Sequence, residues 1–325
     1  MFLMRKRHFI SALFLFVIVA FGTSIWAADA PKLMGKELLI AVATNQYPTD
    51  PVSYDCGDFI PAFARLKIDG ACRAIQKQAP KIAFVGDSHV AQYRSSALLD
   101  LQALNPIVVS QTQCFPFTAT AWREKTQTDD TCKNKQQALL DYLSSANTIQ
   151  TVVLSSRWST LMSGPDFEIA GEGWLKMTGM SEEDKRSFIA NGQKFIATLL
   201  KAGKKVVFMR DIPDLDFKPE TCYNIRPVRL GKAEIRQDCS MAKATFEPRR
   251  QLQNAVLDEM LKPFPSVKVY DPVPLFCQNG RCKASDGPLP YYLNDNHVNN
   301  YGSQFIFKDF VPKFFPEFRP AIKAK

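Results

Sequence analysis

The sequence predicts an α/β fold, a three-layer α/β/α sandwich around a five-stranded parallel, flavodoxin-like sheet. From residue 80 onward, short β-rich apolar runs alternate with segments of helical periodicity, which is typical of a parallel sheet. The runs are nearly continuous in apolar residues, as expected for strands that helices cover on both faces. The chain has 325 residues, 46% of them hydrophobic, and is therefore large enough to bury such a core.

The elements follow one another in a regular order along the chain. Strands are expected at 81–86, 107–111, 151–156, 204–210 and 266–271. Helices are expected at 89–104, 133–146, 181–202, 246–262 and 300–314. The third helix has the clearest limits, because Ser181 opens a capping-box-like sequence and Gly203 follows its end as a C-cap glycine. Two long connections, 111–132 and 211–245, carry the middle cysteines.

The N-terminus has the pattern of an export signal. Three basic residues at 5–7 precede an apolar run over 9–26, and small residues follow it. The run is close to bilayer-spanning length, so residues 1–27 are either a cleaved signal peptide or a retained membrane anchor. We expect residues 28–79 to form an irregular, disulfide-tied lead-in and residues 80–325 to form the main domain.

All eight cysteines follow the export segment, and an exported chain meets an oxidising compartment in which disulfides form. Their order along the sequence groups them into successive local couples. The predicted bridges are Cys56–Cys72, Cys114–Cys132, Cys222–Cys239 and Cys277–Cys282. No C-x-x-C occurs and only two histidines follow the signal, so we expect neither a zinc site nor another metal or cofactor.

The charge of the chain is mildly basic. It has 41 Lys and Arg against 32 Asp and Glu, a net charge of +9. The basic residues form no basic helix and are not interleaved with aromatic residues, so a nucleic-acid partner is not expected. The basicity reflects either a solvated face or attraction to an anionic envelope polymer.

The candidate nucleophile lies where the first strand ends. That strand ends in Gly86-Asp87-Ser88-His89 and leads directly into a helix. Open α/β sheets bind ligands at the carboxyl ends of their strands, and a helix N-terminus favours negative charge. Ser88 can therefore act as a nucleophile whose N–H donates to an oxyanion, with Asp87 bracing the loop. An ordinary helix N-cap would also explain this tetrapeptide.

A serine nucleophile needs a base, and beyond the signal the chain offers only His89 and His297. His89 is adjacent to Ser88, and adjacent helix residues project in different directions. His297 lies beside Asp295 in a polar loop between the last strand and the last helix. We therefore predict that His297 is the base.

The motif at 86–89, with a late acid and histidine before the terminal helix, resembles the SGNH, or GDSL-like, hydrolases. The resemblance is closest to the SGNH domains that follow membrane acyltransferase domains in bacterial proteins that O-acetylate envelope polysaccharides. Those domains have segments similar to 152–158 (VVLSSRW) and to 206–213 (VVFMRDIP), the latter before a cysteine, here Cys222. The resemblance covers residues 81–310 and implies the SGNH hydrolase fold with serine acyl chemistry.

The third member of the expected triad departs from the family pattern. The acid of the family usually stands three residues before the histidine, where this chain has Asn294, and Asp295 is one residue late. Either Asp295 orients His297, which we favour, or a Ser-His dyad works with Asn294 holding the imidazole.

The oxyanion hole departs as well. General members of the family supply a glycine after the second strand and an asparagine after the third, where this chain has Gln111 and Ser156-Arg157-Trp158. The acyltransferase-linked domains share the Arg-Trp pair, so the resemblance implies that Arg157 offers positive charge to an oxyanion or a sugar. Alternatively, Trp158 belongs to the core and Arg157 is a surface ion-pair partner.

These residues predict a serine-dependent acyl-ester enzyme that is exported to the periplasm or another extracytoplasmic site. One acyl-enzyme serves both an esterase and an O-acetyltransferase, because only the acceptor differs. The resemblance implies O-acetyl transfer to, or removal from, an envelope polysaccharide. We expect no membrane acyltransferase domain in this chain, so the acyl donor is either a membrane partner protein or the substrate. The alternative is a carbohydrate-binding or assembly protein without turnover, and loops rich in charge and disulfides disfavour a lipase.

Overall fold

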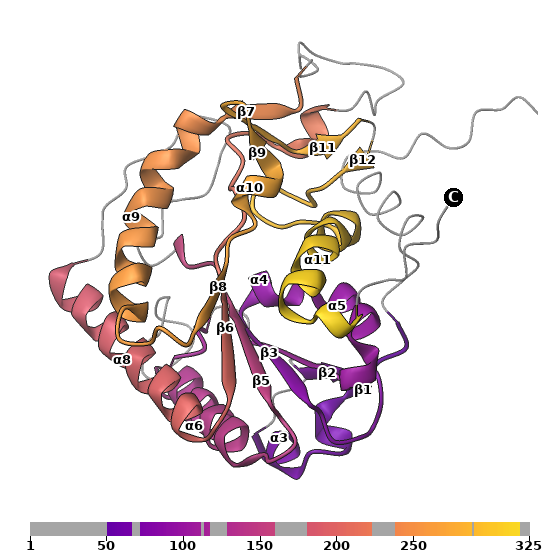
Figure 1. The fold of residues 1–325 in the computed structure, drawn as a ribbon, viewed down its shortest axis with the longest axis vertical. Helices are drawn as coiled ribbons and strands as arrows, with labels where there is room; N and C mark the ends of the chain where they lie inside the picture. Colours follow the sequence, from indigo (N-terminus) through magenta and orange to yellow (C-terminus); the bar gives the residue numbers. More distant parts are fainter. Residues whose placement is uncertain are drawn as a thin grey trace, which may run out of the picture.

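A seven-stranded sheet forms the centre of the computed structural model (Figure 1). The structure describes residues 51–66, 72–111, 114–117, 129–159, 181–222, 238–287 and 289–318, and the predicted export segment lies outside them. The five predicted strands run parallel in the order β4-β3-β5-β6-β8. Their bounds are β3 Ile82–Gly86, β4 Ile107–Ser110, β5 Thr151–Ser155, β6 Lys205–Met209 and β8 Lys268–Tyr270. The predicted α/β fold with a parallel sheet is confirmed.

The sheet is wider than the five strands expected, and the lead-in is not irregular throughout. Strand β2 (Cys72–Ala74) pairs antiparallel with β4, and β1 (Tyr54–Asp55) pairs with β2. The outer edge of β4 exposes unpaired backbone groups, and β2 covers them. The disulfide Cys56–Cys72 links the residue directly after β1 to the first residue of β2. Local sequence could not reveal these strands, because they are only two and three residues long.

Side chains along each strand alternate between two hydrophobic cores. In β3, Val85 belongs to one core and Phe84 to the other. The first core is covered by α3 Pro61–Leu66, α6 Asp129–Ser145, α8 Glu182–Lys201 and α9 Lys243–Leu261. The second is covered by α4 Ser88–Ala91, α5 Arg94–Asp100 and α11 Asn300–Phe314. Figure 1 shows these two groups of helices on opposite sides of the sheet.

Helix ends follow the local chemistry of the sequence. Ser181 caps α8 by accepting a hydrogen bond from the Asp184 N–H, and Gly203 after its end has a φ of +76°, a conformation that favours glycine. Helix α11 has the bounds predicted for it. Among the helices of the described residues, none is both long and apolar enough to cross a membrane.

The helix expected over 89–104 is divided, which corrects that prediction. Helix α4 ends after one turn, α5 follows it, and a 3-10 turn, η2, covers Gln102–Leu104. At the break the Gln92 side chain donates to the His89 carbonyl at 3.0 Å, and the Tyr93 N–H bonds with the Val90 carbonyl instead. A side chain that takes the acceptor of the next helical bond ends the regular ladder.

Small sheets and short helices lie beyond the carboxyl ends of the strands (Figure 1). Strands β7 Ser240–Ala242, β10 Arg281–Lys283 and β9 Cys277–Gln278 form one sheet, and β11 Ser285–Asp286 and β12 Leu289–Pro290 form another. The remaining elements of the part of the chain that the structure describes are α10 Val273–Phe276, η1 Cys56–Asp58, η3 Pro219–Cys222 and η4 Pro316–Phe318.

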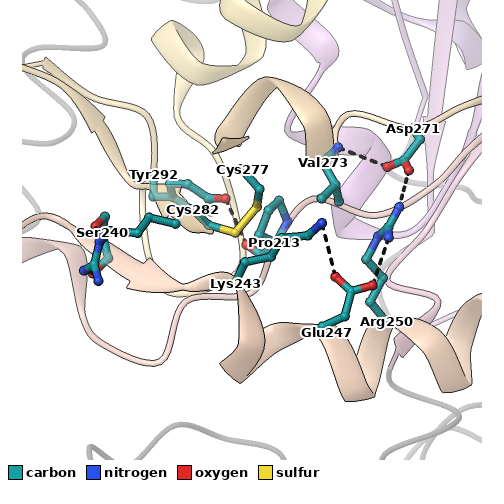
Figure 2. The surroundings of a disulfide bond; sticks show 11 residues. Pro213, Ser240, Lys243, Glu247, Arg250, Asp271, Val273, Cys277, Cys282 and Tyr292 are labelled. Atoms are coloured by element: carbon teal, nitrogen blue, oxygen red, sulfur yellow. Dashed lines mark hydrogen bonds and ion pairs between the residues drawn. A yellow bond between two sulfur atoms is a disulfide. The ribbon is translucent and has the colours of Figure 1, made fainter. Parts of the chain in front are cut away.

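All eight cysteines form disulfides, in the four couples expected from their order. Cys277–Cys282 joins directly opposed residues of β9 and β10. Beside it, the Tyr292 hydroxyl donates to the Pro213 carbonyl at 2.9 Å (Figure 2). This bond ties the segment that follows β12 to the segment that follows β6, and both segments contribute to the site described next.

Candidate active site

Ser88 is the first residue of α4, directly beyond the carboxyl end of β3. The turn before it depends on Gly86, where an added Cβ would lie 1.6 Å from the Ser155 carbonyl oxygen of the neighbouring strand. Only a residue without a side chain allows β3 to pass so close to the end of β5. The glycine therefore fixes where the chain leaves the sheet and where the hydroxyl of Ser88 is presented.

Asp87 braces this turn against the next strand end. Its carboxylate accepts hydrogen bonds from the backbone N–H of His89 at 2.8 Å and from that of Arg157 at 3.0 Å. Burial raises the pKa of Asp87, while the charge of His89 and these N–H donors oppose the rise. Asp87 thus connects the serine turn to the segment after β5.

His297 lies opposite Ser88, with its Nε2 atom 2.9 Å from the Ser88 Oγ atom. It belongs to a tight loop that an isolated bridge between Tyr292 and Val298 closes. The loop is anchored from both sides: the Leu215 N–H donates to the Asp295 carbonyl at 2.7 Å, and the Val298 N–H donates to the Gln92 side chain at 2.8 Å. Two segments 209 residues apart in sequence thereby present a hydroxyl and an imidazole to each other.

Behind His297 the structure has Asn294, and not Asp295 as we favoured from the sequence. The Asn294 Oδ1 atom lies 3.2 Å from His297 Nδ1 and also accepts the His297 backbone N–H at 2.7 Å. The Asp295 carboxylate instead accepts from the Asn296 side chain at 3.0 Å. The loop folds back at Asn294, whose side chain accepts the backbone N–H groups of Asn296 and His297, while the Asp295 side chain contacts Asn296.

This arrangement fixes the tautomer of His297. An amide oxygen can only accept, so Nδ1 carries the hydrogen and Nε2 presents its lone pair to the Ser88 hydroxyl. Burial, together with the positive charges of His89 and Arg157, lowers the pKa of His297 to about 2. A neutral ring in this orientation can accept the proton of Ser88.

A family profile described as SGNH domain (fused to AT3 domains) matches residues 55–312. The chain belongs to this family. Among solved structures, it is similar to the periplasmic domain of a lipopolysaccharide acetyltransferase from Salmonella ser. Paratyphi A, with 13% identity over 80% of this chain and 99% of that chain and a TM-score of 0.46. It is also similar to a GDSL-like lipase from Bacteroides thetaiotaomicron, with 11% identity over 80% and 99% of the two chains and a TM-score of 0.38. No curated protein matches the chain.

Membership of the SGNH family agrees with the enzyme class expected from the sequence, a serine esterase or an O-acetyltransferase. The profile begins at residue 55 and so includes the two short strands at the edge of the sheet. The SGNH domain therefore includes residues 55–79 of the predicted lead-in.

Two residues after β5 have different roles in this SGNH domain. Trp158 is fully buried, stacks on Phe208 with ring centroids 4.6 Å apart, and donates from Nε1 to the Met209 carbonyl at 2.8 Å. It is a core residue. Arg157 is half-buried, and its positive charge acts on both His297 and Asp211. That it offers this charge to an oxyanion or a sugar stays a prediction.

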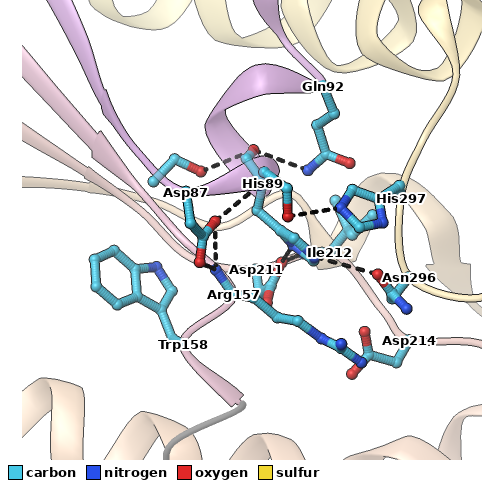
Figure 3. Close-up of polar contacts among 12 residues, drawn as sticks. Asp87, His89, Gln92, Arg157, Trp158, Asp211, Ile212, Asp214, Asn296 and His297 are labelled. Carbon is cyan, nitrogen blue, oxygen red and sulfur yellow. Dashed lines mark hydrogen bonds and ion pairs between the residues drawn. The ribbon is translucent and has the colours of Figure 1, made fainter. Parts of the chain in front are cut away.

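Three buried residues beside the Ser88–His297 pair were not predicted from the sequence as site residues: His89, Asp211 and Asn296. Both ring nitrogens of His89 contact residues other than Ser88: the Nδ1 atom lies 2.7 Å from Asp211 Oδ1 and the Nε2 atom 3.4 Å from Asn296 Oδ1 (Figure 3). The position of Asp211 could have indicated a site residue, because it follows β6 at the same edge of the sheet as Ser88.

Proposed function

We propose that the protein is an extracytoplasmic SGNH enzyme that transfers an O-acetyl group to a cell-envelope polysaccharide or removes one from it. The observation that carries this proposal is the 2.9 Å approach of Ser88 Oγ to His297 Nε2 at the carboxyl edge of the sheet. Membership of a family of SGNH domains fused to AT3 domains supports the choice of an acyl group as cargo.

The reaction begins when His297 Nε2 takes the Ser88 proton and Ser88 Oγ attacks the ester carbonyl. The Ser88 N–H and the charge of Arg157 stabilise the oxyanion of the tetrahedral intermediate. The imidazolium then returns its proton to the departing alcohol, which leaves an acyl-serine. Water or a sugar hydroxyl next gives its proton to His297 and takes the acyl group, so Ser88 regains its hydrogen.

The molecule that accepts the acyl group determines whether the protein is an esterase or a transferase. The molecule that donates the acyl group determines whether a membrane partner protein is needed. In the transferase, a membrane acyl-donor protein supplies the acetyl group and the polysaccharide hydroxyl receives it. In the esterase, the acetylated polysaccharide is itself the donor and water the acceptor. The four disulfides and the apolar N-terminal run support an extracytoplasmic location for either reaction.

Asn294 favours one alternative, an SGNH protein that binds carbohydrate or assists assembly with little turnover. An amide can orient His297, but it cannot stabilise the imidazolium as a carboxylate does. The placement of Ser88 beside His297 Nε2 supports the enzyme over this alternative, because a binding protein does not need a base at its serine.

The experiment is labelling of the purified protein with a fluorophosphonate probe, followed by peptide mapping and by hydrolysis of 4-nitrophenyl acetate. We expect the probe on Ser88, and we expect Ser88→Ala to abolish labelling and hydrolysis while the protein remains folded. Ser181→Ala is the matched control, because it removes one hydroxyl from another helix start and should cost only about 1 kcal/mol of stability.

Acetylated oligosaccharide and a free oligosaccharide acceptor distinguish the two directions of the reaction. Loss of acetyl from the first, read by mass spectrometry, identifies an esterase, and gain of acetyl by the second in the presence of the aryl acetate identifies a transferase. A folded protein with an unlabelled Ser88 and neither product would contradict the proposal and favour the binding protein.

A further inference from the structure

A second imidazole lies beside the base. The rings of His89 and His297 have their centroids 4.5 Å apart, and His89 is fully buried. One of its ring nitrogens lies beside the Asp211 carboxylate, and the other lies beside the Asn296 amide (Figure 3). The reaction proposed above moves no proton through His89, so its burial and its two polar contacts need another explanation.

The hydrogen bonds around His89 determine its protonation. Asp211 Oδ1 accepts the Ile212 backbone N–H at 3.0 Å, and as part of an ionised carboxylate it can only accept from His89 Nδ1 as well. The Asn296 side chain donates from Nδ2 to the Asp295 carboxylate, which turns its Oδ1 atom toward His89 Nε2. Two acceptors require two donors, and only the imidazolium has a hydrogen on each nitrogen.

The charges near His89 agree with an imidazolium. Asp87 accepts its backbone N–H and Asp211 pairs with it from the end of β6, and both carboxylates favour the charged ring, whereas the positive charge of Arg157 at the end of β5 opposes it. A further buried ion pair joins Asp214 and Arg249 nearby. Among the described residues, these groups form a charge cluster of three carboxyl groups and three basic side chains: Asp87, Asp211, Asp214, His89, Arg157 and Arg249.

With its three carboxyl groups ionised, the cluster would carry an excess of negative charge if His89 were neutral. Burial by itself would lower the pKa of His89, but the Asp211 charge and hydrogen bond, with the charge of Asp87, raise it above its usual value. Among the described residues, Ser88 and His89 of α4 and Arg157 after β5 face His297. Arg157 is positively charged, and an imidazolium at His89 would add a second positive charge.

We propose that His89 is a positioning residue for the base: held as an imidazolium by Asp211, it orients the 294–297 loop through Asn296 and keeps the His297 ring neutral in acid. The charge acts across the 4.5 Å between the rings, and like charges at this distance disfavour the protonated form of the second ring. His297 then remains able to accept the Ser88 proton at a pH at which an ordinary histidine is already protonated. This consequence rests on the proposed function, whereas the protonation states do not.

The test is an NMR titration of the protein labelled with ¹⁵N-histidine, from pH 3 to 9, together with the pH profile of kcat/KM. The chain has three histidines, so His89 and His297 can be assigned by single substitutions. We expect His297 to titrate well below pH 6.5 and His89 to stay protonated above it. In His89→Gln, the His297 midpoint and the acid limb of kcat/KM should both rise by at least about one pH unit.

Asp211→Asn is the second variant, in case His89→Gln does not fold. It should lower the pH at which His89 loses its proton and, by removing that positive charge, also raise the midpoint of His297. Asp271→Asn is the control, because it removes a carboxylate that bonds Arg250 and the Val273 N–H and should leave both midpoints unchanged.

The inference is overturned if His297 of the unmodified protein titrates at pH 6.5 or above, or if its midpoint does not rise in either variant. A merely structural role for His89 would lower the rate without moving the midpoint, and that result also overturns it. The NMR readout needs no turnover. An unlabelled Ser88 with a shifted His297 midpoint would therefore refute the proposed function alone, and an active enzyme with an unmoved midpoint would refute this inference alone.

Discussion

Asn294→Ala should weaken both the fold and the reaction. The Asn294 Oδ1 atom accepts from the backbone N–H groups of His297 at 2.7 Å and Asn296 at 3.0 Å, and from the His297 ring at 3.2 Å. A net contribution of about 1 kcal/mol for each bond gives a loss of about 2 to 3 kcal/mol in the free energy of unfolding. The value is an upper figure, because the loop is half-buried and water can replace part of the bonding.

The rate should fall because the ring loses the acceptor that fixes Nδ1–H. A loss of about 1 to 3 kcal/mol in transition-state stabilisation corresponds to a kcat roughly 5- to 150-fold lower. Asn294→Asp should instead raise kcat. A carboxylate at this position keeps the acceptor geometry and adds a negative charge beside the ring, which raises the pKa of His297 and stabilises the imidazolium formed during the reaction.

Asp295→Asn is the matched control, one residue along the same loop. Its carboxylate contacts Asn296, and its backbone carbonyl, which holds the loop to Leu215, is retained in the variant. Its kcat should therefore stay close to that of the unmodified protein. The three variants are compared by kcat and KM on 4-nitrophenyl acetate and by urea unfolding followed by circular dichroism. If Asp295→Asn is slower than Asn294→Ala, with both folded, the assignment of Asn294 is refuted.

Three further predictions concern stability. Gly86→Ala should abolish folding or lower the melting temperature severely, because the added Cβ would lie 1.6 Å from the Ser155 carbonyl oxygen. A melting temperature within a few degrees of that of the unmodified protein would contradict the close approach described for β3 and β5. Arg249→Met should cost about 3 to 5 kcal/mol in urea unfolding, because it leaves the buried Asp214 carboxylate without its cation, and a loss below about 1 kcal/mol would mean that the pair is solvated. The folded-state pKa of His297 is lowered from 6.5 to about 2. Below about pH 6.5 the unfolded chain therefore binds a proton on His297 that the folded chain does not bind, so the free energy of unfolding should fall as the pH drops from 6.5 toward 2. His297→Gln should flatten that part of the profile of unfolding free energy against pH, and an unchanged slope would show that the ring titrates normally.

Local chemistry was sufficient to predict most of the fold. Apolar runs of strand length predicted the five parallel strands, and Ser181 with Gly203 predicted both ends of α8. The short strands at 54–55 and 72–74 were not predicted. Their pairing depends on the exposed edge of β4 and on a disulfide, and neither can be recognised in the few residues of the strands themselves. The break between α4 and α5 was not predicted because it depends on the hydrogen bond from the Gln92 side chain to the His89 carbonyl.

The sequence by itself determined the α/β class, the four cysteine couples and the pairing of Ser88 with His297, because each follows from local pattern, order or elimination among few candidates. Only the tertiary structure decided which neighbour supports the base and what surrounds it. Asn294 rather than Asp295 faces the imidazole because the loop folds back by three residues, and spacing alone does not give that direction. Asp211 reaches His89 across 122 positions in the sequence, because parallel strands bring their carboxyl ends to one edge, where distant residues share one buried charge cluster.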